Sequence, residues 1–378
     1  MFQIHDKKRN MFMLDGKFAK KGYDWWWHSF TARNTRTGKE KAFFIEFFTI
    51  NPAFGQDEPI FGQLPVNKEN NIKPSYLMVK CGCWGEGAIQ LNRFFGWRNV
   101  KINNTAPFSI FADDCKCSEH VLQGHVKIDE NTAKNHPEYM TDAGEMSFDL
   151  EMQKDIAFNV GYGASTLFRK LKAFEMYWHA EGIKTRYKGK ITLNGEEYIA
   201  NFDNSYGYAD KNWGSDFTSP WLWLSSCCMQ SRISGKKLSD SAFEMGGGRP
   251  KVFGIALNKK LLGGLWYEGK EYEYNFSKIW QKPKVSFKST ETEKNILWHV
   301  IYENKNSKID VRVKCKKKDM LLINYEAPNG KKLHNRLWNG GNGVGNIKLY
   351  EKIGENHKLV DDIIMTHVGC EYGEYSRK

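Results

Sequence analysis

The stretch "KGKITLNGEEYIANF", Lys188 to Phe202, holds two runs of β-forming residues separated by Asn194-Gly195. Asn-Gly favours a type I′ turn, because both central positions of that turn need a positive φ angle. The stretch therefore predicts a β-hairpin with a two-residue loop. It makes an antiparallel β fold the first expectation for this chain.

Three further stretches have the same strand–turn–strand pattern: "HSFTARNTRTGKEKAFFIEFF" turning at Thr37-Gly38, "LWYEGKEYEYNF" centred on Gly269, and "LWHVIYENKNSKIDVRVKC" turning near Asn304–Asn306. Short strands with frequent turns are typical of β-sandwiches and β-barrels. The best helical candidate is "STLFRKLKAF", Ser165 to Phe174. Because 378 residues exceed what one small core usually holds, we expect two β domains, 1–175 and 176–378.

The chain has a net charge of +12, but its lysines are spread along the whole sequence. The densest run, Lys314 to Lys318, continues an alternating segment from Ile309, which is typical of a strand with one solvated face. We therefore expect no nucleic-acid binding, and only a possible peripheral contact with an anionic membrane. No apolar run is long enough for a membrane span, and the N-terminus lacks the apolar core of a signal peptide, so we expect a cytoplasmic protein.

Eight cysteines without a secretory signal are expected to be reduced thiols. The pairs Cys81/Cys83 and Cys115/Cys117 offer four thiolates, but Cys-x-Cys is not the usual spacing of a structural zinc site. The same spacing simply places two small side chains on one face of a strand. Glycine clusters without a strand–helix context read as turns, and we expect neither metal nor cofactor.

The segment "GYDWWWHSF", Gly22 to Phe30, joins aromatic rings to one carboxylate. On a strand, one face carries Asp24, Trp26 and His28, and the other carries Tyr23, Trp25 and Trp27. A buried carboxylate needs a partner or becomes neutral. Asp24 is therefore either a structural residue that caps a turn or a proton donor in an apolar pocket. Glu46 lies in a similar apolar run, where an ion pair with a lysine is as plausible as catalysis.

A third segment, "GYADKNWGSDFTSPWLWL", Gly207 to Leu224, repeats the combination of rings and charges. Tyr208 and Asp210 share one face of an extended segment, as do Trp221 and Trp223. Indole faces raise the pKa of a nearby acid by desolvation and stabilise positive charge. An acid beside such rings is what a reaction through a protonated alkene requires, so the sequence predicts a non-polar pocket with acidic groups.

The block "YADKNWG…PWLWL" resembles the tocopherol cyclase family, which carries Tyr-Ala/Ser-Glu-Lys-Asn-Trp-Gly followed by Pro-Arg-Lys-Trp-Phe-Trp. "GYDWWWHSF", "INPAF" and "GGLWYEGKEYEYNF" resemble further segments of that family in the same order. The resemblance implies an all-β fold of two lipocalin-like antiparallel β-barrel domains with a pocket between them and few short helices. Carotenoid hydratases and β-barrel pericyclases share that arrangement. It also implies cofactor-free protonation of a prenyl double bond and capture of the cation by a phenol oxygen.

The chain departs from the family pattern at several positions. Asp210 and Asp24 stand where the family has Glu, and Trp27 replaces a Tyr, while Glu46 has no counterpart and the Arg-Lys pair before Trp221 is missing. Each Asp is one methylene shorter than Glu, which moves the acid back from the substrate. The resemblance therefore points to the fold more firmly than to the substrate.

From these patterns we expect a cofactor-independent cyclase or isomerase that protonates an alkene of a hydrophobic isoprenoid or polyketide-like substrate. The alternatives are a hydratase, a non-catalytic carrier of a hydrophobic ligand, and a scaffold in which Lys211 pairs with Asp210; the oligomeric state stays open. Asp210 or Asp24 would donate the proton. The expected catalytic residues are Asp210, Asp24, Lys211 and Tyr208, and the expected substrate-binding residues are Trp26, Trp27, His28, Glu46, Asn212, Trp213, Trp221 and Trp223.

Overall fold

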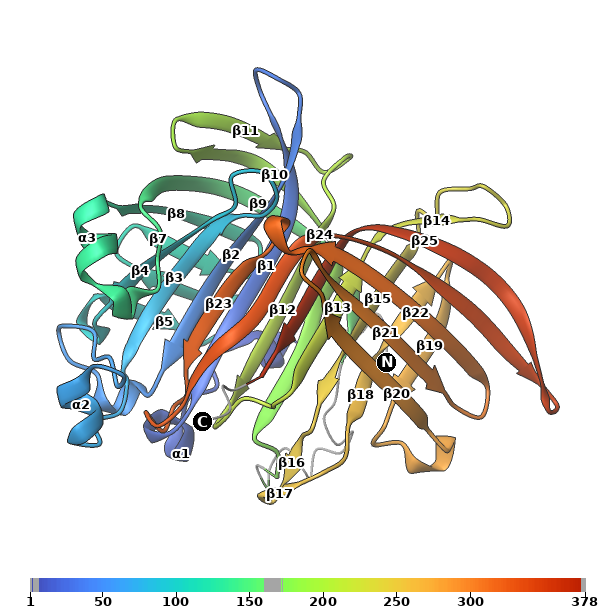
Figure 1. Ribbon diagram of the computed structural model, residues 1–378. Coiled ribbons are helices and arrows are strands. Elements are labelled where there is room, and N and C mark those ends of the chain that lie inside the picture. The colour runs from blue at the N-terminus through green and yellow to red at the C-terminus, as the bar shows by residue number, and fades with distance from the viewer. Residues whose placement is uncertain (1, 3–6, 160–170, 172, 375–378) are drawn as a thin grey trace.

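The computed structural model describes residues 2, 7–159, 171 and 173–374. The described chain is built mainly of antiparallel strands in two large sheets, which lie side by side in Figure 1. The helices are short: α1 (Gly16–Lys20), α2 (Pro65–Glu69), α3 (Glu130–Asn135), η1 (Lys7–Asn10), η2 (Pro52–Phe54), η3 (Trp97–Asn99), η4 (Pro137–Tyr139), η5 (Ile279–Gln281) and η6 (Lys317–Asp319). The predicted all-β class with few short helices is confirmed.

The first sheet has 12 strands in the order β4-β3-β2-β1-β11-β10-β9-β8-β7-β6-β5, and β12 pairs with β1 and β10. It curls round so that β4 approaches β8, which gives it a barrel shape. Its strands are β1 (Tyr23–Asn34), β2 (Glu40–Ile50), β3 (Tyr76–Cys83), β4 (Ile89–Phe95), β5 (Val100–Asn103), β6 (Ser109–Ala112), β7 (Cys115–Ser118), β8 (Val121–Ile128), β9 (Gly144–Phe158), β10 (Met176–Leu193), β11 (Glu196–Ala200) and β12 (Gly207–Gly214).

The second sheet has 11 strands in the order β19-β18-β15-β13-β25-β24-β22-β21-β20, with β14 paired to β25 and β23 paired to β24. It is more open than the first and forms a half-barrel (Figure 1). Its strands are β13 (Trp221–Ser226), β14 (Cys228–Ser231), β15 (Ser241–Gly248), β18 (Lys260–Tyr267), β19 (Lys270–Asn275), β20 (Lys284–Glu291), β21 (Asn295–Glu303), β22 (Ser307–Lys316), β23 (Leu321–Glu326), β24 (Leu333–Ile353) and β25 (Asn356–Gly373). A separate hairpin is formed by β16 (Lys251–Val252) and β17 (Ile255–Ala256).

All four hairpins predicted from the sequence are confirmed. The β10–β11 turn has φ angles of 48° at Asn194 and 80° at Gly195, as a type I′ turn needs. The other three are the pairs β1–β2, β18–β19 and β21–β22. The predicted helix over residues 165–174 lies almost wholly outside the described residues.

The change from one sheet to the other falls between Gly214 and Trp221. Strands β10, β11 and β12 pair with the first sheet, so the domain boundary predicted near residue 175 does not coincide with this change of sheet. Two hydrophobic clusters fill the interiors of the two sheets. A third cluster lies between them and draws side chains from both, among them Trp27 and Trp223.

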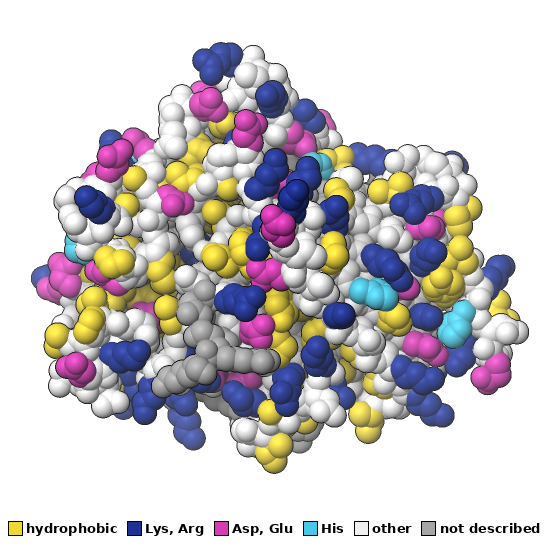
Figure 2. Space-filling view, viewed as in Figure 1, with side chains coloured by type: hydrophobic (Ala, Val, Ile, Leu, Met, Phe, Trp, Pro, Cys, Tyr) yellow, Lys and Arg dark blue, Asp and Glu magenta, His cyan; other side chains and the backbone are white. Residues whose placement is uncertain are grey.

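The Cys-x-Cys pairs lie on strands, as their spacing indicates. Cys81 and Cys83 belong to β3, Cys115 and Cys117 to β7, and all four thiols are buried in the interior of the first sheet. Over the described ranges, no group of three or more His, Cys, Asp or Glu side chains is placed to hold a metal ion. No helix in the same ranges is long and apolar enough to cross a membrane. Figure 2 shows Lys and Arg scattered among Asp and Glu on the face it presents.

Candidate active site

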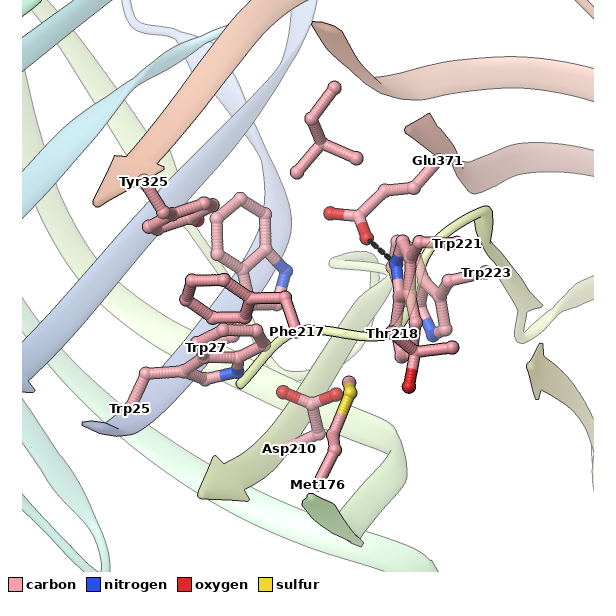
Figure 3. A pocket seen from close by; sticks show the side chains of 11 residues that line it. Trp25, Trp27, Met176, Asp210, Phe217, Thr218, Trp221, Trp223, Tyr325 and Glu371 are labelled. Carbon is pink, nitrogen blue, oxygen red and sulfur yellow. Dashed lines mark hydrogen bonds between the residues drawn. The ribbon is translucent and has the colours of Figure 1, made fainter. Parts of the chain in front are cut away.

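A narrow cavity lies between the two sheets and leaves about 30 Å³ in which the centre of a water molecule can be placed. Figure 3 shows its walls, which come mainly from aromatic side chains, and two carboxyl groups that enter it from different sheets. The lining residues are Trp25 and Trp27 of β1, Met176 of β10, Asp210 of β12, Phe217 and Thr218 of the β12–β13 connection, Trp221 and Trp223 of β13, Tyr325 of β23, Leu337 of β24 and Glu371 of β25.

The pairing of β1 with β12 decides which side chains reach the cavity. Trp27 lies opposite Asp210, and the next pair along is Trp26 opposite Lys211. Because successive side chains of a strand point to opposite faces, Trp27 and Asp210 face the cavity. Trp26 instead lies in the hydrophobic cluster inside the first sheet. The alternation predicted for Gly22 to Phe30 is confirmed.

Asp210 is buried and is held by neutral donors only. Its Oδ2 accepts hydrogen bonds from Trp178 Nε1 (2.7 Å) and from the Tyr208 hydroxyl (2.9 Å). Burial raises the pKa of Asp210 to about 8, an effect that the two hydrogen bonds only partly oppose. Among the described residues Oδ1 has no hydrogen-bond partner, nor has Trp27 Nε1 across the strand pair. The cavity therefore offers a protonated carboxyl group and an N–H donor with no protein partner.

Tyr208 connects Asp210 to a second acid. Its hydroxyl lies within hydrogen-bonding distance of both Asp210 Oδ2 and Glu244 Oε1. A hydroxyl carries one proton, so it can donate to one of these oxygens only, and the other carboxyl group must be protonated to donate to it. Burial raises the pKa of Glu244 well above its ordinary value, and the nearby Asp210 raises it further. The three residues thus form a buried chain of groups that can hold and exchange protons.

Glu371 is the second carboxyl group in the cavity wall and comes from the second sheet. Its Oε2 accepts a hydrogen bond from Trp221 Nε1 (2.6 Å), and its Oε1 accepts one from Asn339 Nδ2. Burial raises the pKa of Glu371 to about 7, although these donors favour the charged form. Two buried carboxyl groups with raised pKa values therefore line the same cavity.

Asp24 and Lys211 form an ion pair whose side chains are fully buried. Asp24 Oδ2 also accepts a hydrogen bond from the Met13 backbone N–H (2.7 Å). The Lys211 ammonium group lies over the rings of Trp26 (4.6 Å) and Trp213 (4.8 Å). Burial raises the pKa of Asp24 to about 6 even though Lys211 stabilises the charged form. Neither residue lines the cavity.

Glu46 has the lysine partner that the sequence analysis allowed for. It pairs with Lys80 (3.3 Å), and both side chains are fully buried. The Tyr325 hydroxyl donates to Glu46 Oε2 (2.8 Å), and the Lys80 ammonium group lies 3.9 Å from the centre of the Tyr325 ring. Tyr325 also lines the cavity, and its hydrogen bond to Glu46 joins β23 to β2, while the Glu46–Lys80 pair joins β2 to β3.

Only some of the predicted site residues line the cavity. Asp210, Trp27, Trp221 and Trp223 line the cavity, and Tyr208 touches it through Asp210. The residues that lie away from it are Asp24, Lys211, Trp26, His28, Glu46, Asn212 and Trp213. The alternative in which Lys211 pairs with Asp210 is wrong, because alternation turns the two side chains to opposite faces and Lys211 pairs with Asp24.

His28 and Asn212 each have a hydrogen-bond partner on another strand of the first sheet. His28 Nδ1 lies 3.2 Å from the Tyr187 hydroxyl, which donates to the Tyr208 backbone oxygen (2.9 Å). Asn212 Oδ1 accepts a hydrogen bond from the Tyr23 hydroxyl (2.9 Å).

Sequence reasoning missed Glu371 and Glu244. Glu244 is the single acid of β15, "SAFEMGGG" (residues 241–248), and Glu371 is the single acid of the last part of β25, "VGCEYG" (residues 368–373). The same signal had singled out Glu46. It identifies buried carboxylates, but it cannot tell which of them meet in one cavity.

Comparisons with known proteins agree on one family. A family model described as tocopherol cyclase-like matches residues 109–374. A probable chloroplastic tocopherol cyclase of Oryza sativa subsp. japonica is 31% identical over 146 residues, which cover 38% of this chain and 28% of that protein. A chloroplastic tocopherol cyclase of Zea mays is 33% identical over 104 residues, 27% of this chain and 20% of that protein. The matches thus span less than a third of these relatives.

Two solved structures resemble the whole chain at low sequence identity. A putative AttH from Nitrosomonas europaea has a TM-score of 0.44 and 11% identity, covering 92% of this chain and 93% of that chain. Kievitone hydratase from Nectria haematococca has a TM-score of 0.45 and 9% identity, covering 98% of this chain and 95% of that chain.

Proposed function

The chain belongs to the tocopherol cyclase-like family, and from this premise we propose that it is a cofactor-independent cyclase or isomerase for a hydrophobic isoprenoid or polyketide-like substrate. In this proposal Asp210 protonates an alkene of the substrate. The observation that carries it is a buried carboxyl group with a pKa of about 8 and an unpartnered oxygen, in a cavity walled by tryptophans. A carboxylic acid kept protonated near neutral pH is a competent general acid.

The first step forms a C–H bond between the Asp210 proton and one alkene carbon and leaves a cation on the other carbon. The indole faces of Trp27, Trp221 and Trp223 lie around this space, and such faces attract positive charge. The apolar wall also keeps out water that would capture the cation early. This step requires no cofactor, since the proton comes from the protein.

The second step closes the ring when a hydroxyl oxygen of the same substrate attacks the cation and forms a C–O bond. Glu371 accepts the proton that this oxygen loses, because it is the second carboxyl group in the cavity wall and faces Asp210 across the cavity. Asp210 then regains a proton through Tyr208 from Glu244. The atoms of the product equal those of the substrate, and the enzyme's protons are restored by exchange with solvent.

The presence of a second carboxyl group also favours a hydratase as the second candidate. The protonation step would be the same, but a water held by Glu371 would attack the cation. The product would then gain the mass of one water. A non-catalytic carrier, in contrast, would release its ligand unchanged.

Native mass spectrometry of protein purified from its own host would identify the class of hydrophobic ligand. The ligand is then incubated with the protein in D₂O, and the product is examined for deuterium on carbon. A product of unchanged composition with one new C–D bond is expected of the cyclase. A product that has gained water supports the hydratase, and a bound ligand that never incorporates deuterium would overturn the proposed protonation.

The Asp210→Asn variant separates the role of this acid from binding. It should bind the same ligand but form the C–D bond far more slowly than the wild type, since the amide cannot deliver the proton. If Asp210→Asn incorporates deuterium as fast as the wild type, Asp210 is not the donor.

A further inference from the structure

Two loops at one end of the second sheet expose large apolar side chains to solvent. The β16–β17 hairpin exposes Phe253 (63%) and Ile255 (71%), and the turn η5 exposes Ile279 (78%) and Trp280 (62%). Single exposed apolar residues are common on soluble proteins. It is less usual for two neighbouring loops, the β16–β17 hairpin and η5, each to expose two such residues. We call these two segments the apolar loops.

The apolar loops extend from the same end of the sheet. The hairpin directly precedes β18 and η5 directly follows β19, and these strands pair so that Leu262 near the start of one lies opposite Asn275 at the end of the other. Figure 1 shows both segments at the lower end of the second sheet.

The β16–β17 hairpin also lies close to the cavity. Val252 of the hairpin forms a β-bridge with Phe174, and Lys251 Nζ pairs with Glu175 (2.8 Å). Met176, the next residue along, lines the cavity, as does Phe217 of the β12–β13 connection. The first apolar loop therefore packs directly beside the residues that border the cavity.

Lysines accompany both apolar loops. Lys278 and Lys282 flank Ile279 and Trp280, and Lys259 follows the hairpin. Lys259 and Lys282 are exposed, while Lys278 is partly buried and pairs with Glu273. In Figure 2 apolar side chains reach the lowest edge of the molecule with Lys and Arg around them. Trp beside Lys suits the boundary of a bilayer, where the ring enters the headgroup region and the ammonium group meets lipid phosphates.

We propose that the two apolar loops dock this end of the protein onto the surface of an anionic lipid bilayer. Phe253, Ile255, Ile279 and Trp280 enter the headgroup region, and the flanking lysines contact anionic headgroups. The cavity then lies close to the membrane, from which a hydrophobic ligand can enter it. The docking itself is independent of the proposed function, and only the entry of substrate rests on it.

Vesicle co-sedimentation tests the docking. The probes are vesicles of phosphatidylcholine alone and of phosphatidylcholine with phosphatidylglycerol, at low and high salt and with no substrate. The full chain should bind the anionic vesicles, more weakly at high salt, and should bind the neutral ones poorly. The variant Ile279→Ser/Trp280→Ser should lose about ten-fold or more in affinity.

A matched control is available on the side of the molecule where β11 and β14 lie in Figure 1, away from the apolar loops. Ile199 of β11 (41%) and Ile233 (63%), which follows β14, are also exposed. The variant Ile199→Ser/Ile233→Ser should bind vesicles like the wild type. Equal loss in the two double variants, or no binding of wild-type protein to anionic vesicles, would overturn the proposal.

Light scattering tests whether the apolar loops bind a second copy of the chain instead of lipid. A wild-type dimer that Ile279→Ser/Trp280→Ser converts to a monomer would assign the loops to self-association and would also overturn docking on lipid. Because vesicle binding is measured without substrate, a negative result leaves the proposed catalysis untouched. Conversely, an inactive protein that binds anionic vesicles would refute the proposed function alone.

Discussion

Two buried carboxylates on adjacent strands, Asp24 and Asp210, have opposite surroundings. Asp24 faces the interior of the first sheet, where Lys211 supplies a cation and Met13 a backbone N–H. Asp210 faces the cavity, where its partners are the neutral groups of Trp178 and Tyr208. Both side chains are removed from water, and the pKa is about 6 for Asp24 and about 8 for Asp210.

Both acids are buried, so the presence of a cation, rather than burial, is what distinguishes Asp24 from Asp210, to which we assign the proton transfer. A buried carboxylate with an ammonium partner can remain charged and fixes two strands to each other. A buried carboxyl group with neutral donors keeps its proton near neutral pH and can deliver it. The predictions below replace one of these acids or remove one of its partners.

The largest effect is expected from Asp210→Asn. The amide fills the same space but has no acidic proton, so turnover of the ligand identified from the host should fall by about 10²–10⁴-fold, the usual contribution of a general acid. Asp24→Asn should retain most of the activity, because Asp24 lies outside the cavity. Steady-state rates of the two variants against wild type measure the difference. Comparable losses in both would contradict the separation of the two acids.

Removing the cation should make the paired region unstable. Lys211→Met leaves Asp24 buried without its partner, and breaking a buried pair in this way costs about 3–4 kcal/mol in the free energy of unfolding. Urea denaturation measures it. In the double variant Asp24→Asn/Lys211→Met most of the loss should return, since no uncompensated charge remains. Lys190→Met breaks an exposed pair with Glu197 and should cost less than about 1 kcal/mol.

The sequence predicted the fold better than it predicted the site. Turn residues and alternation act locally, so Asn194-Gly195 and the strand faces of Gly22 to Phe30 predicted structure that is confirmed. The partner of Asp24 is set by the pairing of β1 with β12, which joins residues far apart in the chain. The sequence analysis allowed a pair between Lys211 and Asp210, whereas the pairing of β1 with β12 brings Lys211 to Asp24.

The cavity depends on contacts that are more distant still. Glu371 of β25, the last strand in the chain, and Tyr325 of β23 line the same cavity as Asp210 of β12. No local pattern places these strands beside β1. The resemblance to a known family supplied the expectation of a pocket between two β domains, whereas the acids that line it became evident only with the strands in place.

The raised pKa of Asp210 should make the free energy of unfolding depend on pH. Between the ordinary carboxyl pKa of 3.8 and its folded value of about 8, the folded state binds the proton more tightly than the unfolded state. Stability therefore falls as pH rises through this window. From pH 6 to pH 8 the wild type should lose about 2 kcal/mol relative to Asp210→Asn. Urea unfolding of both proteins at several pH values checks this, and parallel curves would mean that Asp210 has an ordinary pKa.

The smallest effects concern the chain from Glu244 through Tyr208 to Asp210. Glu244→Gln keeps a hydrogen-bonding group at Tyr208 but removes the acidic proton that replenishes Asp210. The first turnover should therefore proceed at the wild-type rate, since Asp210 starts protonated, whereas steady-state turnover should fall about ten-fold. Rapid-quench measurement of the first turnover beside the steady-state rate separates the two.

Tyr208→Phe gives a second, independent signature. The Tyr208 hydroxyl lowers the pKa of Asp210 by hydrogen bonding to its charged form, so its removal should raise that pKa. Activity should then persist to higher pH than in the wild type, while Glu244→Gln should keep the wild-type alkaline limit because Tyr208 is still present. If both variants lower the first turnover equally and leave the pH profile unchanged, Tyr208 and Glu244 only support the shape of the cavity, and Asp210 must regain its proton by another path.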